Sequence, residues 1–190
     1  MTTAPATHWP AVFTAMFAGV VGAFAYGKMS PALPLLKEEF GLSLIQAGWL
    51  VSAFNAIAAS GALFFGAFAD RFGALRFCIS GTLLIAAASA LGALAPGATL
   101  LIALRLAEGL GFLAVVVSAP ALIAAATAPG SRGMAFGLWA TYLPLGVSIV
   151  IAASPLLLAD FGWRAEWVFV ALAGGACALL LGAQSRRYAG

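Results

Sequence analysis

The stretches without an ionisable side chain set the strongest constraint on how this chain can fold. Asp, Glu, Lys and Arg are absent from residues 1–27, 40–69, 77–104, 109–131, 133–159 and 167–185. A helix that crosses the hydrocarbon core of a bilayer needs about 20 predominantly apolar residues, and each interval is close to or above that length. The pattern predicts an all-α membrane protein with six transmembrane helices.

Composition supports the same fold class. The chain is 64% hydrophobic and 8% charged, with a mean hydropathy of +1.08, whereas a soluble domain is about 25% charged. The basic residues are scattered, so we expect no nucleic-acid partner. We place the helices at residues 9–28, 43–66, 77–95, 99–128, 134–158 and 167–184, with 1–8 as an N-terminal tail and 185–190 as a C-terminal tail or the start of a linker.

The basic residues between the helices predict the orientation in the bilayer. Short cytoplasmic segments carry an excess of Lys and Arg. If the N-terminus is inside, five such residues fall on the cytoplasmic side and two outside: Arg71, Arg76, Arg132, Arg186 and Arg187 against Lys37 and Arg164. We therefore expect a multi-pass protein of the cell (inner) membrane with both termini cytoplasmic. Residues 1–8 carry no positive charge, so the first helix is not a secretory signal.

The sequence repeats weakly at a constant offset of 89 residues. Pro31-Ala32-Leu33 corresponds to Pro120-Ala121-Leu122, and Gly22, Gly48 and Gly73 correspond to Gly111, Gly137 and Gly162. This register pairs helices one to three with helices four to six. Because transporter folds are often built from inverted three-helix units, we predict two such repeats.

The segment between helices two and three carries the most specific motif. Residues 66–76 read Gly-Ala-Phe-Ala-Asp-Arg-Phe-Gly-Ala-Leu-Arg. Its pattern Gly-x-x-x-Asp-Arg-x-Gly resembles the signature loop of the major facilitator superfamily of secondary transporters. Glycines permit a tight turn, and arginines favour the cytoplasmic side. The residues concerned are Gly66, Asp70, Arg71, Gly73 and Arg76.

The resemblance implies that Asp70 helps to latch an inner gate against the other half of a transporter. The alternative is a loop that only sets topology.

A second match to the family lies in helix four. Residues 105–111 resemble the family's Arg-x-x-x-Gly-x-Gly segment. Arg105 and Glu108 are three residues apart, share one helix face and can form an ion pair inside the membrane. The resemblance implies that Arg105 faces the central pathway and takes part in substrate or proton coupling, with Glu108 as its partner and a protonation site. The alternative is a purely structural ion pair.

Helix five only partly follows the family pattern. Antiporters of the family usually carry Gly-Pro followed by Gly-Gly there, and only Pro144 and Gly146 echo it. Export by proton exchange is therefore not supported by this segment. Pro144 removes a backbone hydrogen bond and is expected to kink the helix, with Tyr142 bringing a polar group to its middle.

Lys28, in the segment Tyr26-Gly27-Lys28, has two interpretations. The favoured one is that its ammonium group snorkels to the outer interface. If it points inward instead, Lys28 and Arg105 form a cationic outer cavity suited to a small organic anion, to which Tyr26 is adjacent and Asn55 could add hydrogen bonds.

The resemblance covers residues 9–187 and implies a secondary active transporter that works by rocker-switch alternating access. Members of the family typically have twelve spans in two halves, and this chain supplies six, so we interpret it as an N-terminal half. The expected partners are the lipid bilayer, a small-molecule substrate and a second six-helix half, covalent or separate. We expect no cofactor and no metal site, since the two cysteines, Cys78 and Cys177, lie in apolar runs.

Other classes of membrane protein remain as alternatives. The chain could be a six-span solute-binding subunit that docks onto an ATPase, since it has no phosphate-binding loop of its own. It could also be a membrane assembly protein or a fragment that does not transport. An intramembrane serine protease is disfavoured, because the one histidine, His8, precedes the first helix. We therefore do not expect an enzyme.

Overall fold

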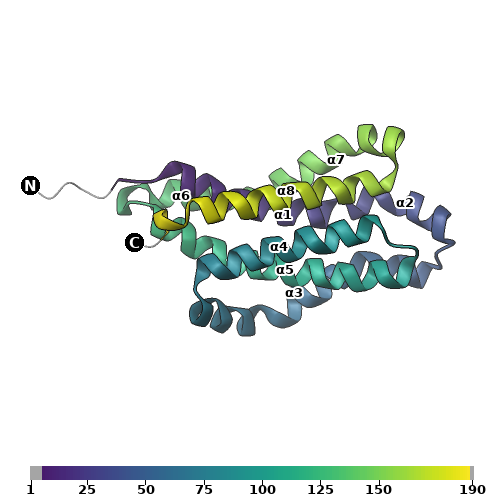
Figure 1. The fold of residues 1–190 in the computed structure, drawn as a ribbon, viewed down its shortest axis with the longest axis horizontal. Coiled ribbons are helices and arrows are strands. Elements are labelled where there is room, and N and C mark those ends of the chain that lie inside the picture. The colour runs from purple at the N-terminus through teal and green to yellow at the C-terminus, as the bar shows by residue number, and fades with distance from the viewer. Residues whose placement is uncertain (1–5, 189–190) are drawn as a thin grey trace, which may run out of the picture.

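The protein is a bundle of long helices (Figure 1). The computed structural model describes residues 6–188, apart from the side chains of 58–64, 67 and 70. Within that range all regular structure is helical. The elements are α1 (Trp9–Gly27), α2 (Met29–Phe40), α3 (Leu44–Phe72), α4 (Ala74–Ala93), α5 (Ala98–Ala126), η1 (Pro129–Ser131), α6 (Arg132–Trp139), α7 (Tyr142–Phe161), α8 (Trp163–Ala183) and η2 (Ser185–Arg187).

These elements form six passes along the bundle, because α1 with α2 and α6 with α7 each make one pass. Figure 1 shows both termini at one end, which we call the near end, together with the α3–α4 turn. The α2–α3, α4–α5 and α7–α8 connections lie at the far end. Five passes are long and apolar enough to cross a membrane, and α3 contributes the apolar segment Leu44–Ile57. The predicted all-α, six-helix membrane fold is confirmed.

The first pass is longer than the predicted range 9–28, because the helix continues to Phe40 after a local break at Lys28. Pro31 lies in the first turn of α2. A proline is tolerated there, since the backbone N–H that it lacks would have little to bond to. The sequence pattern ended this span at the first charge, but the structure places that charge inside the bundle.

Glycines end three of the passes. Gly73 has φ +85° and separates α3 from α4 by a single residue, and Gly162 with φ +70° does the same between α7 and α8. Gly41 ends α2 with φ +58°. This backbone region is open to glycine at little cost. Two of these residues, Gly73 and Gly162, are partners in the 89-residue repeat, so the two repeats turn at equivalent positions.

The fifth pass is interrupted between Trp139 and Tyr142. Pro144 lies in the first turn of α7, directly after the break, as expected for a residue that cannot continue the hydrogen-bond ladder of the preceding helix. Gly146 lies in the contact with α1. A Cβ on it would come within 2.8 Å of the Val20 carbonyl oxygen. Gly146 therefore allows α7 to approach α1 closely.

The helix contacts have an approximate two-fold pattern. α1 packs on α7 as α5 packs on α3, and α4 packs on α5 as α8 packs on α1. At the α5–α3 crossing, a Cβ on Gly109 would lie 2.7 Å from the Phe54 carbonyl oxygen. Val20 and Gly109, the α1 and α5 residues at these two crossings, are 89 positions apart. The crossings therefore follow the register of the predicted inverted repeats.

Two adjacent glycines of α8 allow a direct test of this packing. A Cβ on Gly174 would meet the Ala86 Cβ of α4 at 2.9 Å, whereas a Cβ on Gly175 has open space. We expect Gly174→Ala to destabilise the protein by about 1–3 kcal/mol through overpacking. Gly175→Ala should leave stability nearly unchanged. Apparent melting temperatures in detergent measure the difference, and equal losses would contradict the packing described.

Candidate functional site

Glu108 lies between two cations in the interior of the bundle. Its Oε1 is 2.6 Å from Lys28 Nζ, and its Oε2 is 2.8 Å from Arg105 Nη1. Lys28 comes from the α1–α2 junction, and the other two residues from α5. All three side chains are at most 1% exposed. The predicted Arg105–Glu108 ion pair is confirmed, and Lys28 joins it to form a charged triad.

Other polar groups add hydrogen bonds to the charged triad. Ser89 of α4 accepts from Lys28 at 3.0 Å and donates to Glu108 Oε1 at 2.6 Å. Arg105 donates to the carbonyl oxygens of Ala25 at 2.5 Å and Leu50 at 3.4 Å. These bonds matter because each of them lowers the cost of burying an ion. The site thereby ties together α1, α3, α4 and α5.

Aromatic rings cover both cations. Lys28 Nζ lies 4.3 Å from the centre of the Trp167 ring, and the Arg105 guanidinium carbon lies 4.7 Å from the centre of the Phe54 ring. The negative ring faces attract a desolvated cation. The charged triad holds two positive charges and one negative charge, so it retains a net positive charge inside an apolar bundle.

The favoured interpretation of Lys28, that it snorkels to the outer interface, is wrong. Its side chain is fully buried and bound to Glu108. Sequence spacing places Arg105 near Glu108 because both are on one helix, but it does not show which depth and face Lys28 shares with them. The inward alternative is observed, but without a free ammonium group, since Glu108 and Ser89 both engage it.

A cavity of about 240 Å³ lies beside the charged triad. It opens among α1, α2, α3, α5 and α7. Arg105 is the charged residue in its lining. The lining residues are Tyr26, Gly27, Met29, Ser30, Leu33, Val51, Arg105, Val147 and Ile151. The cavity therefore combines an apolar wall with one guanidinium group.

Not every candidate pathway residue reaches this cavity. Tyr26 lines it and packs on Phe54, with 5.6 Å between the ring centres. Tyr142 instead stacks on Trp139 at 4.3 Å, at the start of α7. Asn55 is exposed on α3 and is absent from the lining. The structure thus brings Tyr26, Arg105 and Glu108 together with Lys28, and leaves Asn55 and Tyr142 apart from them.

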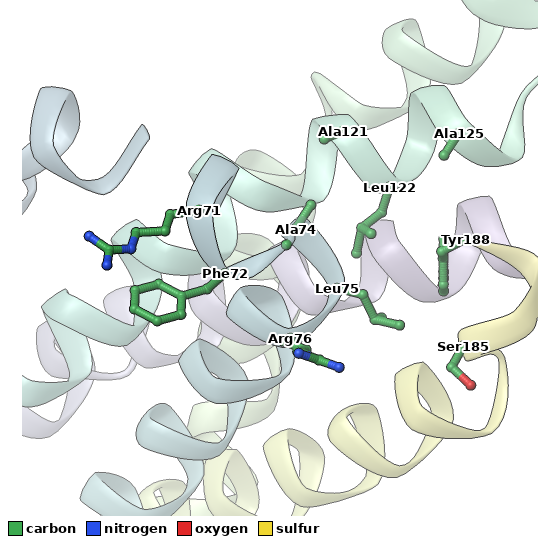
Figure 2. Close-up of a pocket in the computed structure, with 11 residues that line it drawn as sticks. Arg71, Phe72, Ala74, Leu75, Arg76, Ala121, Leu122, Ala125, Ser185 and Tyr188 are labelled. Carbon is green, nitrogen blue, oxygen red and sulfur yellow. The ribbon is translucent and has the colours of Figure 1, made fainter. Parts of the chain in front are cut away.

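The segment 66–76 was predicted as a loop, but it is helical except at Gly73, because α3 runs on to Phe72 and α4 begins at Ala74. This motif lies at the near end, beside a cavity of about 560 Å³ (Figure 2). Gly73, Arg71 and Arg76 line it together with residues from the end of α5 and the C-terminal segment. Figure 2 shows Arg71 pointing away from this segment, whereas Arg76 extends between α4 and the chain near Ser185. Gly66 lines an adjacent cavity. The Asp70 side chain lies outside the described residues.

The C-terminal segment is anchored at the same end. The Tyr188 hydroxyl donates to the Ala11 carbonyl oxygen at 2.7 Å, and burial raises the pKa of this phenol. The contact joins the segment after α8 to the start of α1.

Comparison with known proteins identifies the family. The model of the Major Facilitator Superfamily matches residues 15–188. The chain belongs to this superfamily. It is accordingly a membrane protein of a transporter family and not an enzyme, and the resemblance noted in the loop and in α5 is confirmed.

The relatives of this chain are named as resistance proteins, efflux pumps and solute transporters. The puromycin resistance protein pur8 of Streptomyces alboniger is 33% identical over 152 residues, which are 80% of this chain and 30% of that protein. The multidrug efflux pump LfrA of Mycolicibacterium smegmatis is 30% identical, with 72% and 27% covered. The niacin transporter NiaP of Acinetobacter baylyi is 27% identical, with 83% and 36% covered. The chain thus spans about a third of the length of these relatives.

Solved structures share the fold. A peptide transporter POT in complex with sulfate superposes with a TM-score of 0.83 at 19% identity, over 95% of this chain and 38% of that one. The inward-open xylose transporter XylE from E. coli gives 0.71 at 18% identity, over 90% and 47%. At these identities the likeness concerns the fold alone.

Sequence reasoning missed one buried acid. The predicted range of the sixth helix, residues 167–184, leaves Glu166 just outside the membrane-spanning segment. In the structure α8 begins at Trp163, directly after Gly162, and Glu166 is fully buried within it. The glycine followed by a tryptophan-rich segment was the available signal for an earlier helix start.

The charged triad predicts unequal effects of removing its members. Glu108→Gln leaves two buried cations facing each other, so we expect a loss of about 3–5 kcal/mol. Lys28→Gln should cost less, because the Arg105–Glu108 pair that remains is neutral. The double variant should recover part of the loss of Glu108→Gln.

The readout is the apparent melting temperature of the four proteins in the same detergent. Glu39→Gln is the control, because its pair with Arg164 is exposed and worth less than about 1 kcal/mol. Additive losses in the double variant would contradict the charged triad.

Proposed function

We propose that this chain is the N-terminal six-helix half of a secondary active transporter that moves a small organic solute by rocker-switch alternating access. The observation that carries this proposal is the cavity beside the charged triad, in a chain of the Major Facilitator Superfamily. Alternating access in such folds takes place around a site between two halves. The coverage of about a third of each relative supports the presence of further helices in the working transporter.

The cavity chemistry favours an amphipathic solute. Met29, Leu33, Val51 and Ile151 supply an apolar wall, and Arg105 supplies the charge. Among the described residues, the hydrogen bonds of Arg105 use Nη1 and Nε, which leaves Nη2 without a protein acceptor. We infer a solute with an apolar body and a carboxylate or other acceptor group directed at Arg105. Lys28 is not part of this recognition, because Glu108 and Ser89 occupy it.

Two observations bear on the direction of transport. The fifth pass retains only Pro144 and Gly146 of the antiporter pattern. The relatives pur8 and LfrA are nevertheless named for resistance and efflux. The proposal also includes a gating role for the 66–76 motif, through Gly66, Asp70, Arg71, Gly73 and Arg76.

Two isoleucines of α7 test the cavity with matched substitutions. Ile151 lines the cavity and Ile149 does not. The two residues are similarly exposed, Ile151 at 47% and Ile149 at 41%, so they are matched in residue type and exposure and differ at the cavity. In the intact protein, reconstituted in liposomes, we expect Ile151→Trp to lower the rate of solute uptake or release at least tenfold, because the larger indole occupies part of the 240 Å³ cavity that the solute needs. Ile149→Trp should transport at nearly the native rate.

The substrates for this assay are aromatic and aliphatic carboxylates, with neutral and cationic analogues of the same size alongside. Equal losses of transport rate in Ile149→Trp and Ile151→Trp would refute the assigned cavity. Preference for the cationic analogues would refute the role of Arg105.

We propose that the protein lies in the inner membrane with its near end facing the cytoplasm. Five of the seven basic residues in the connections favour it. Cysteines introduced at the exposed positions Arg132 and Arg164 test it, because the native Cys78 and Cys177 are buried. We expect a membrane-impermeant maleimide to label Arg164→Cys in intact cells and Arg132→Cys only after permeabilisation. The reverse pattern would invert the topology.

A further inference from the structure

A second buried carboxyl group lies outside the charged triad. Glu166 of α8 has 0% of its side chain exposed. Its Oε1 contacts the Ser154 hydroxyl of α7, while its Oε2 has no hydrogen-bond partner in the described part of the chain. The indole Nε1 of the next residue, Trp167, is also unpartnered there. An ionised carboxylate buried with an unbonded oxygen is far more costly than a neutral carboxyl group.

Counting the hydrogens of Ser154 shows where a proton belongs. Its Oγ lies 2.7 Å from the Val150 carbonyl oxygen and also contacts Glu166 Oε1. A serine hydroxyl has one hydrogen to donate. Serines inside helices commonly donate it to the carbonyl four residues earlier, here that of Val150. When Ser154 does so, its contact with Glu166 needs a hydrogen from the carboxyl group.

The equivalent count at Glu108 gives the opposite result. Ser89 accepts from Lys28 and donates its one hydrogen to Glu108 Oε1. Lys28 and Arg105 also donate to the two oxygens of Glu108. Every contact of Glu108 is therefore satisfied by an ionised carboxylate. The family resemblance pointed to Glu108 as a protonation site, but the hydrogen bonds leave that role to the second acid.

The charges around Glu166 are few. Lys28, at the α1–α2 junction, interacts electrostatically with it. On α8, Arg164 is engaged by Glu39 of α2 at 2.7 Å, and Asp160 of α7 is exposed. The ionisable side chains of α4, Arg76 and Cys78, lie near the start of that helix, whereas its contact with Trp167 is at Gly92 near the end. Lys28 is thus the charge that would respond to ionisation of Glu166.

We infer that Glu166 is the proton-binding site of this six-helix unit and that it carries its proton in the conformation described here. Uptake converts the carboxylate and one H⁺ from solution into a carboxylic acid, and no other bond changes. Release returns that proton and gives Lys28 a second carboxylate to face besides Glu108. The net positive charge of the charged triad is then neutralised. The further step, that this exchange drives solute movement, rests on the proposed transport function.

Infrared spectroscopy tests the proton site without any transport. The intact protein, labelled with ¹³C-glutamate in a detergent that lacks ester and carboxyl groups, is measured at neutral and alkaline pH. We expect the carbonyl band of a protonated glutamic acid at neutral pH, lost in Glu166→Gln and retained in Glu39→Gln. Absence of the band in the native protein, or its persistence in Glu166→Gln, would overturn the inference.

Ser154→Ala keeps the test decisive if Glu166→Gln does not fold. Removing the hydroxyl changes the hydrogen bonding of the protonated carboxyl group, so we expect the band to shift in frequency. An unshifted band in a folded Ser154→Ala protein would overturn the assignment to Glu166.

Transport by the intact protein separates this inference from the proposed function. We expect Glu166→Gln to transport solute at least tenfold more slowly than the native protein under a pH gradient. Glu39→Gln should transport at the native rate. If Glu166→Gln loses the infrared band but the native protein transports no solute, the proton site stands and the proposed function is refuted. A solute flux with a native pH dependence in Glu166→Gln would refute the coupling through Glu166.

Discussion

The placement of Glu108 between Lys28 and Arg105 is the interaction on which the interior of this protein depends. A carboxylate and two cations inside an apolar bundle are costly unless they are paired and hydrogen-bonded. Ser89 and the carbonyl oxygens of Ala25 and Leu50 add hydrogen bonds to the two ion pairs. Because these partners come from α1, α3 and α4, the charge arrangement and the relative positions of the helices require each other.

Close helix approach makes that arrangement reachable. In lipid there is little hydrophobic force between helices, so backbones must come near enough for dispersion contacts. Gly109 provides this where α5 crosses α3, and Gly146 where α7 crosses α1. The two crossings bring Arg105 toward the Leu50 carbonyl oxygen and close the wall of the cavity beside it. The inverted repeat therefore places the charged residues as well as the helices.

The two buried acids differ in the protonation state that their surroundings stabilise. Glu108 is surrounded by donors and is suited to a permanent negative charge. Glu166 has one hydroxyl partner and an unbonded oxygen, and it shares Lys28 as an electrostatic neighbour. In the proposed transporter, Glu108 would hold the structure together and Glu166 would change charge. Division of these roles between two helices lets the charge change without breaking the charged triad.

Much of the fold was predictable from the sequence because its determinants are local. Apolar length predicted the six passes, the glycines of the 66–76 motif predicted a tight turn there, and the three-residue spacing of Arg105 and Glu108 predicted their ion pair. The inward position of Lys28, the burial of Glu166 and the exposure of Asn55 were decided only by tertiary structure. Each depends on the rotation and depth of one helix relative to another, and helix packing sets these through contacts between residues far apart in the chain.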